Sequence, residues 1–119
     1  MNVAILGASP KADKYANMAQ VKLLAHGHSV VGVNPALPDL GGVQVAKSVS
    51  ELPAGIDTLT VYVGSERSSA LADEILAYGF RRVVFNPGAE NPTLASRLRE
   101  KGVETVEGCT LVMLSSRQF

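Results

Sequence analysis

Five short runs of apolar and β-branched residues recur along the chain, and they limit the folds that it can adopt more than any other feature. The runs are residues 3–6, 30–33, 58–63, 82–85 and 103–106. Each run is apolar on both faces, which is typical of strands in a sheet that is covered on both sides. Helical patterns separate most of the runs. Strands that alternate with helices form a parallel sheet, because parallel neighbours need crossover connections.

Three of the four intervals between the runs predict a helix with recognisable ends. Asn91 is a candidate N-cap with Pro92 at the first helical position, and Ser65 is a candidate N-cap for the preceding helix. A glycine follows each pattern, where a helix C-terminus favours a left-handed residue. The predicted helices are residues 15–26, 67–78 and 92–101, with glycines at positions 27, 79 and 102.

The remaining interval, residues 34–57, is rich in proline and glycine and predicts a loop with one helical turn near residues 50–52. Residues 110–114 are expected to add a last short strand or to lie along the sheet edge. The fold class is therefore α/β: a three-layer Rossmann-like domain with a parallel sheet of about five strands in the order 3-2-1-4-5. A chain of this length provides one domain, residues 1–119.

The charge balance limits the partners that the protein can have. Eleven Lys and Arg residues match eleven Asp and Glu residues, whereas nucleic acids and membrane surfaces attract proteins with a basic excess. We therefore expect neither partner. The first residues lack the features of a signal peptide, and no apolar run is long enough to span a membrane. These observations predict a cytoplasmic protein.

The side chains that could support catalysis or hold a metal are few and scattered. Cys109 is the only cysteine, so a disulfide within the chain and a cysteine-based zinc site are excluded, and a small buried hydrophobic residue is its simplest interpretation. His26 and His28 are expected at the end of the sheet opposite the ligand edge, without a third metal ligand. Glu90 precedes a predicted helix and is expected to face solvent. The sequence predicts no catalytic residue and no metal site.

In such a sheet, ligands bind beyond the carboxyl ends of the strands where the strand order reverses, here between the first and fourth strands. The loops that meet there are rich in small residues and in Asn, which let backbone N–H groups approach an anion. These loops are residues 7–14, 34–35, 64–65 and 86–88.

The first of these loops resembles a phosphate-binding turn without matching the dinucleotide fingerprint. Gly-x-Gly-x-x-Gly would need glycines where Ser9 and Ala12 stand. Lys11 and Lys14 flank the start of the following helix, where ammonium groups can neutralise phosphate beside the helix dipole.

The end of the second strand distinguishes between nucleotide ligands. NAD sites place Asp or Glu here for the ribose hydroxyls, whereas this chain has Asn34-Pro35 and no acidic residue until Asp39. A neutral, rigid corner suits the face of an adenine. NAD is therefore disfavoured. NADP would require an arginine nearby, and none occurs between Val33 and Glu66.

At these loops the sequence resembles the small CoA-binding protein family, single-domain relatives of the N-terminal domain of the succinyl-CoA synthetase alpha subunit. The most specific pieces are residues 7–10, Gly-Ala-Ser-Pro, and residues 33–35, Val-Asn-Pro, and the resemblance covers essentially the whole chain. Two pieces depart from the family: Gly64-Ser65 stands where Pro-Pro is common, and residues 86–88 replace a Gln-x-Gly segment. The synthetase also uses a second domain with a phosphorylated histidine, for which we expect no counterpart here.

The resemblance implies a role for each loop at the ligand edge. Gly7, Ala8 and Ser9 would contact the phosphates, with Lys11 beside them and Lys14 or Tyr15 near the phosphate or ribose. Asn34 and Pro35 would pack by the adenosine, Val63 and Gly64 would line the pocket wall, and Asn86, Pro87 and Gly88 would lie toward the pantetheine. Of the arginines, only Arg67 is placed to add positive charge for the 3′-phosphate of CoA, and as a surface charge it is expected to have a small effect.

These observations favour a protein that binds coenzyme A or an acyl-CoA and is not catalytic by itself. One alternative is an NAD(P)-binding oxidoreductase or redox sensor on the same fold. Another is a scaffold or interaction subunit with a vestigial cleft, for which residues 111–114 followed by Phe119 are the candidate apolar patch. Two further possibilities, a homo-oligomer and a complex with a protein partner, are left open by the sequence.

Overall fold

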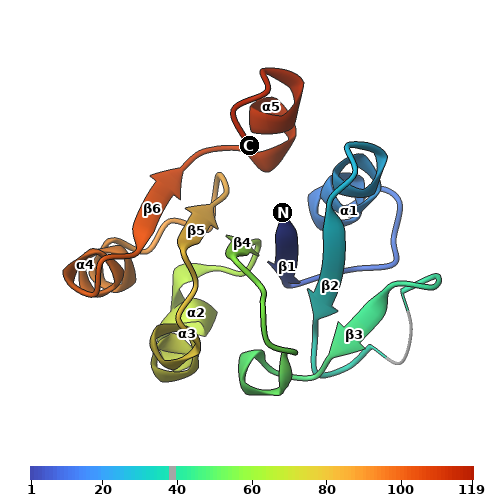
Figure 1. Ribbon diagram of the computed structural model, residues 1–119. Helices are drawn as coiled ribbons and strands as arrows, with labels where there is room; N and C mark the ends of the chain where they lie inside the picture. Colours follow the sequence, from blue (N-terminus) through green and yellow to red (C-terminus); the bar gives the residue numbers. More distant parts are fainter. Residues whose placement is uncertain (38–39) are drawn as a thin grey trace.

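Six strands form one parallel sheet with helices on both of its faces in the computed structural model, which describes residues 1–37 and 40–119 (Figure 1). The strands are β1 Asn2–Leu6, β2 Ser29–Val33, β3 Gln44–Ala46, β4 Thr58–Val61, β5 Arg82–Phe85 and β6 Glu104–Glu107. The helices are α1 Tyr15–Ala25, α2 Ser65–Ala70, α3 Ala72–Tyr78, α4 Pro92–Glu100 and α5 Thr110–Ser115, with a 3-10 turn, η1, at Val49–Glu51. Pro38 and Asp39, which the sequence analysis mentioned, lie outside the described residues.

The strand order is β3-β2-β1-β4-β5-β6, so the predicted order 3-2-1-4-5 is confirmed and continues with a sixth strand. The third strand is not residues 58–63, however. It is β3, in the segment that was expected to be a loop, where Gln44 pairs with Val31 of β2. Residues 58–61 are the fourth strand, and Thr58 pairs with Val3 of β1. Three residues are too few to show a strand pattern, and their pairing with β2 is a long-range contact.

Two predicted elements were wrong in detail. The helix expected over residues 67–78 is interrupted at Leu71, so α2 and α3 are separate, and α2 is capped by Gly64 rather than by the side chain of Ser65. Residues 110–114 form helix α5 rather than a strand. In that helix Leu114 is buried and the Lys22 ammonium of α1 donates a hydrogen bond to the Leu111 carbonyl, so packing on α1 favours the helix.

Other local predictions are confirmed. Helix α4 begins at Pro92, and the Asn91 side chain accepts a hydrogen bond from the Leu94 amide over 3.1 Å. Helix α3 ends at Gly79, which has a left-handed φ of 89°. The predicted turn near residues 50–52 is present as η1.

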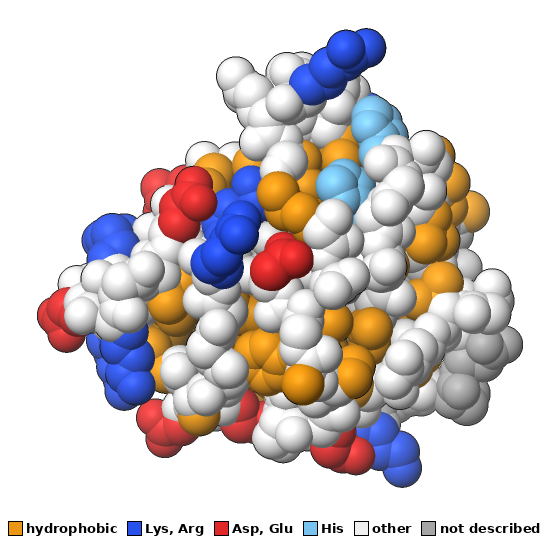
Figure 2. All heavy atoms as spheres, in the orientation of Figure 1, with side chains coloured by type: hydrophobic (Ala, Val, Ile, Leu, Met, Phe, Trp, Pro, Cys, Tyr) orange, Lys and Arg blue, Asp and Glu red, His pale blue; other side chains and the backbone are white. Residues whose placement is uncertain are grey.

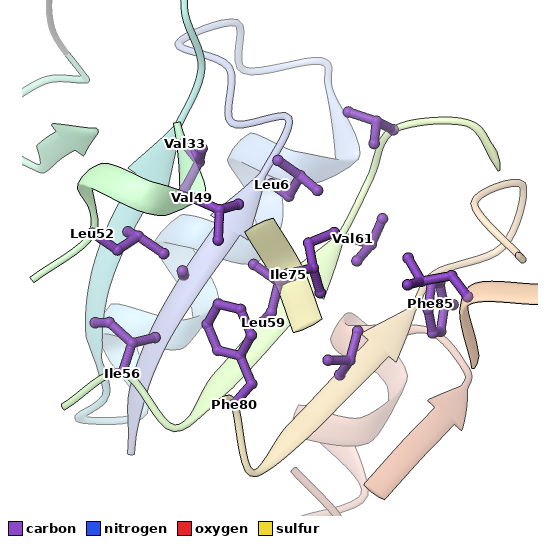
Figure 3. Close-up of a cluster of buried hydrophobic side chains, with 14 of the residues drawn as sticks. Leu6, Val33, Val49, Leu52, Ile56, Leu59, Val61, Ile75, Phe80 and Phe85 are labelled. Carbon is purple, nitrogen blue, oxygen red and sulfur yellow. The ribbon is translucent and has the colours of Figure 1, made fainter. Parts of the chain in front are cut away.

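Alternate side chains of the strands point to opposite faces of the sheet and form two apolar clusters. Ala4 and Leu6 belong to the first cluster, which η1, α3 and α4 cover (Figure 3). Val3 and Ile5 belong to the second, which α1 and α5 cover. Because β1, β4 and β5 are buried on both faces, the sheet is a rigid base on which the loops at its carboxyl edge are mounted.

The amino edge of the sheet brings the first and last residues of the sequence together. The Met1 ammonium lies 3.0 Å from Nδ1 of His28, and the Phe119 ring packs edge-on against His28 and lies 4.4 Å below the Arg82 guanidinium. Burial, with the amino-terminal charge as the second cause, lowers the pKa of His28. Both histidines are thus at the edge opposite the carboxyl ends, as expected.

The surface shows no dominant sign of charge on the face drawn in Figure 2, where basic and acidic side chains are interspersed. None of the described helices is both long and apolar enough to cross a membrane. In the stretch proposed as an apolar patch, Leu114 is buried and Val112 is strongly exposed, at 63%.

Candidate functional site

A cavity of about 330 Å³ opens at the carboxyl ends of β1, β2 and β4, at the point where the strand order reverses. It is the larger of two hollows at this edge of the sheet, and we call it the larger cavity. Its floor is mostly apolar, and two cationic side chains stand on its walls. The lining residues are Leu6, Gly7, Val33, Asn34, Pro35, Lys47, Ser48, Val49, Val63, Arg67, Ala70 and Leu71.

Gly7 starts the loop after β1, and the geometry there requires glycine. Its φ is +91°, and a Cβ at this position would lie 2.9 Å from Cγ1 of Val63. Its amide donates to the Val33 carbonyl over 3.1 Å, which holds the loop against the end of β2. The absence of a side chain leaves the backbone of the loop open to the cavity.

Asn34 forms the corner that follows β2, and both polar atoms of its side chain are hydrogen-bonded within the protein. Its Nδ2 donates to the Ala8 carbonyl over 2.9 Å, and its Oδ1 accepts from the Ala36 amide over 2.9 Å. The second bond is an Asx turn that places Pro35 on the cavity wall. A neutral side chain thus shapes the position where NAD sites carry a carboxylate.

The rest of the first loop runs from the larger cavity to the start of α1. Ala8 is buried, and it packs against Gly32, where a Cβ would approach the Ala8 methyl to 2.9 Å. The Ser9 hydroxyl accepts from the Lys11 amide, and the Ser9 carbonyl accepts from the Asn17 side chain. No side chain caps α1, so the partial positive charge at its start is not neutralised by a side-chain acceptor of the described chain.

A second hollow, of about 240 Å³, lies at the same edge of the sheet but on the opposite face. We call it the smaller hollow. Tyr62 packs with the second apolar cluster and the adjacent Val63 with the first, so these two consecutive residues separate the smaller hollow from the larger cavity. None of its described lining residues is charged: they are Tyr15, Tyr62, Asn86, Pro87, Cys109 and Leu111.

Asn86 is at the end of β5 and anchors the smaller hollow through a buried polar network. Its Nδ2 donates to the Thr60 hydroxyl over 2.7 Å and to the Val61 carbonyl over 2.9 Å. Its Oδ1 accepts from the Thr110 amide, and the Thr60 and Thr110 hydroxyls are themselves 2.8 Å apart. All of the polar side-chain atoms of Asn86 are therefore paired, and they join α5 to the sheet.

Tyr62 contributes an unusual hydroxyl to this region. The hydroxyl oxygen is buried and has no hydrogen-bond partner among the described residues. Burial is the main cause that raises the pKa of Tyr62 to about 12, and the nearby Thr110 hydroxyl acts in the opposite direction. Cys109 is partly exposed beside it, so the expectation of a fully buried cysteine was wrong. Its position just before α5 places it on the wall of the hollow.

The structure divides the residues predicted for the site between the two hollows. Gly7, Asn34, Pro35 and Val63 line the larger cavity, and Tyr15, Asn86 and Pro87 line the smaller hollow. Ala8, Ser9, Lys11, Lys14, Gly64 and Gly88 line neither, although residues 8–14 connect the two. Sequence reasoning missed Lys47, which follows a strand that was itself missed; Arg67 was expected near this edge and lines the larger cavity.

Potential metal ligands do not gather anywhere in the described chain: no group of three or more His, Cys, Asp and Glu side chains could hold an ion there.

Comparison with known proteins identifies the family. A family model described as a CoA binding domain matches residues 1–115. The chain belongs to this CoA-binding domain family. The expected resemblance is confirmed, and a CoA-binding domain with a Rossmann-like parallel sheet accounts for nearly the whole chain.

Proteins similar to this CoA-binding domain cover 84% to 99% of its length. A crystal structure of an uncharacterized protein is 37% identical, with a TM-score of 0.93 over 99% of this chain and 97% of that chain. The uncharacterized protein YneT of Bacillus subtilis (strain 168) is 27% identical over 84% of this chain and 74% of its own length. The dinucleotide-forming acetyl-coenzyme A synthetase 1 of Ca. Korarchaeum cryptofilum shares the fold, at 23% identity and a TM-score of 0.76, over 90% of this chain and 25% of that chain.

Proposed function

We propose that residues 1–119 form a single domain that binds coenzyme A or an acyl-CoA across the carboxyl edge of the sheet. One observation carries the proposal: two hollows of different chemistry open at this edge, on opposite faces, and the loop at residues 7–14 connects them. An elongated ligand with one charged end and one neutral end matches this arrangement. Coenzyme A has such ends, an adenosine with phosphates and a pantetheine arm.

The adenosine end fits the larger cavity. Pro35, Val63 and Leu71 provide flat or apolar walls for a base, and Lys47 and Arg67 provide positive charge. No carboxylate is among the described lining residues, so the carboxylate with which NAD sites bind the ribose has no counterpart there. This difference supports CoA over NAD.

The diphosphate would cross the loop between the two hollows. The start of α1 lacks a capping side chain, and Lys11 and Lys14 stand beside it. The Ser9 hydroxyl accepts one hydrogen bond within the loop and keeps its proton for donation to an anion. Ala8 is buried and would contribute through its backbone. Backbone amides and two lysines would thus share the phosphate charge.

The pantetheine arm would enter the smaller hollow, which has no charged lining residue. Tyr15, Pro87 and Leu111 offer apolar surface for its methylene and methyl groups, and the thiol or thioester would approach Cys109. Gly64 and Gly88 have no side chains, so they would leave room for the ligand at the turns that follow β4 and β5.

We infer that this domain binds its ligand without catalysing a reaction of its own. Neither hollow is lined by Asp, Glu or His among the described residues, so no carboxylate or imidazole among them is placed to act as a general acid or base at the ligand. The acetyl-coenzyme A synthetase that shares this fold supports the choice of ligand. We further propose that the protein is cytoplasmic and that its ligand is a small molecule. Neither a nucleic acid nor a membrane is proposed as a partner.

Thermal shift and calorimetry with CoA, acetyl-CoA, NAD and NADP test this function. A ligand at about 100 times its Kd stabilises the protein by about 2.7 kcal/mol, which is a shift of several degrees for a domain of this size. We expect shifts with CoA and acetyl-CoA and none with NAD. A shift with NAD or NADP alone would support the oxidoreductase alternative, and no shift with any of the four would favour the scaffold.

A matched pair of variants tests the site. Ala70→Trp places an indole in the larger cavity from the exposed face of α2, whereas Ala77→Trp places the same group on the exposed face of α3, outside both hollows. We expect the first variant to lose CoA binding and the second to keep it. Both side chains are small and exposed, so the folds should survive, which circular dichroism will check. CoA binding that is unchanged in Ala70→Trp would contradict the assignment.

A further inference from the structure

Two cationic side chains reach the larger cavity from different elements. Lys47 follows β3 and Arg67 is in α2, on the other side of the cavity. Both are exposed, and the described lining residues include no carboxylate. The chain as a whole has equal numbers of acidic and basic residues, eleven of each, so an excess of two cations at one cavity is a local feature.

Neither cation has a partner among the described residues. Some of the other basic side chains are engaged: Lys22 donates to the Leu111 carbonyl, Arg97 pairs with Asp73, and Arg99 donates to Thr105. Lys47 and Arg67 make no ion pair and no side-chain hydrogen bond within the described chain. Their charges are therefore free to meet an anion in the cavity.

Among the described residues, the carboxylates nearest in sequence to the cavity are held by other groups or lie outside its lining. Glu51 accepts a hydrogen bond from the Ser48 hydroxyl over 3.2 Å, and Glu74 accepts one from the Ser50 amide over 3.1 Å. Glu66 precedes Arg67 in α2 but does not line the cavity. A phosphate at the cavity mouth would therefore face two cations across the opening.

The chemistry of the proposed ligand points to which phosphate this is. The diphosphate of CoA would lie at residues 7–14, beyond Gly7 on the cavity wall. CoA carries a further phosphate on the 3′ oxygen of its adenosine ribose, and this group would remain at the mouth of the cavity that holds the base. A guanidinium can bind a phosphate through two parallel hydrogen bonds, and an ammonium adds a compact charge.

We propose that Lys47 and Arg67 together bind the 3′-phosphate of the ligand and make the larger cavity selective for adenosine that carries it. This inference rests on the proposed function, because it assumes that CoA occupies the site. It goes further by naming the group that distinguishes CoA and its thioesters from dephospho-CoA, which lacks only that phosphate. It also assigns the selectivity to two residues, neither of which forms a salt bridge within the described structure.

Isothermal titration calorimetry with CoA and with dephospho-CoA tests the inference. We expect the unaltered protein to bind CoA about tenfold or more tightly than dephospho-CoA, as suits charge-assisted hydrogen bonds at a partly open site. Lys47→Ala and Arg67→Ala should each reduce this preference, and the double variant should bind both ligands with similar affinity. Their affinity for dephospho-CoA should change little. Lys101→Ala, which removes an exposed cation at the end of α4, is the control and should keep the full preference.

The outcomes separate the two proposals. Equal affinity of the unaltered protein for CoA and dephospho-CoA would overturn the inference and leave CoA binding intact. A preference that survives in the double variant, or that is lost equally in Lys101→Ala, would also overturn it. Failure to bind either compound would overturn the proposed function itself. Thermal unfolding of each variant without ligand will show that a lost preference is not a loss of folded protein.

Discussion

The side-chain amide of Asn34 donates a hydrogen bond to the backbone carbonyl of Ala8 over 2.9 Å, and this bond joins the two loops that enclose the larger cavity. The Asn34 carbonyl oxygen accepts from the Ala36 amide in the same corner. Both polar atoms of the side chain are hydrogen-bonded within the protein, so Asn34 shapes the site, and one Nδ2 proton remains for a ligand. The neutral corner at Asn34, which distinguishes this site from an NAD site, therefore acts by holding the two loops of the cavity in place.

Replacing this side chain should weaken both the fold and ligand binding. Asn34→Ala removes two hydrogen bonds and leaves the Ala8 carbonyl without its partner, so the free energy of unfolding should fall by about 1–3 kcal/mol. Asn2→Ala is the control, because its side chain donates one exposed hydrogen bond to the Gly55 carbonyl at the opposite edge. Urea denaturation and CoA titration measure both effects. Equal losses of CoA affinity in the two variants would show that the corner has no special role.

Gly7 should tolerate no side chain, for two separable reasons. Gly7→Ala introduces a residue at φ +91° and a Cβ within 2.9 Å of Cγ1 of Val63. Gly55→Ala introduces a residue at the nearly identical φ of +92° with no atom within 4 Å. Both should destabilise the protein by about 1 kcal/mol or more from the backbone alone. The additional loss in Gly7→Ala, measured by urea denaturation, is the cost of the contact with Val63. If the two variants are equally stable, that contact relaxes without cost.

Tyr62 should make the protein less stable at alkaline pH. Burial raises the pKa of Tyr62 to about 12 from its usual 10.0, so the unfolded chain releases this proton first. The resulting stability is present below pH about 10 and is lost as the pH rises from about 10 toward 12. Tyr62→Phe removes this dependence. It should also be neutral or stabilising at pH 7, because the hydroxyl has no described partner. Urea denaturation over this pH range, with both proteins, gives the comparison; parallel pH profiles would contradict the prediction.

Cys109 should report on occupation of the smaller hollow. It is the only cysteine, it is partly exposed, and it lines the hollow in which the pantetheine arm is proposed to lie. We expect acetyl-CoA, whose thiol is blocked, to slow alkylation of Cys109 in proportion to the occupied fraction of the protein. Mass spectrometry follows the reaction, and the Ala70→Trp variant, which should not bind, provides the unprotected rate. Alkylation that is unaffected at saturating acetyl-CoA would place the arm elsewhere.

Much of the architecture was predictable, because it depends on local patterns. The apolar runs at residues 3–6, 30–33 and 82–85 are strands buried on both faces, as their composition indicated. Asn91 and Gly79 mark the ends of helices because one caps N–H groups and the other adopts a left-handed φ. The position of the candidate ligand site at the carboxyl edge of the sheet was predictable from the alternation of strands and helices. These properties are encoded within a few neighbouring residues each.

Long-range packing determined the rest. Residues 44–46 pair with β2 although their segment is rich in proline and glycine, and the apolar run at residues 110–114 is a helix because it packs on α1. A short apolar run fits a strand or a helix equally well, so only its neighbours select one. For the same reason Lys47 could not be assigned to the cavity before β3 was known. The sequence by itself determined most of the elements and the edge at which we propose that a ligand binds. The contacts between distant segments placed Lys47, Arg67 and Cys109 around it, because side-chain positions across a sheet depend on strand order and helix docking rather than on any local pattern.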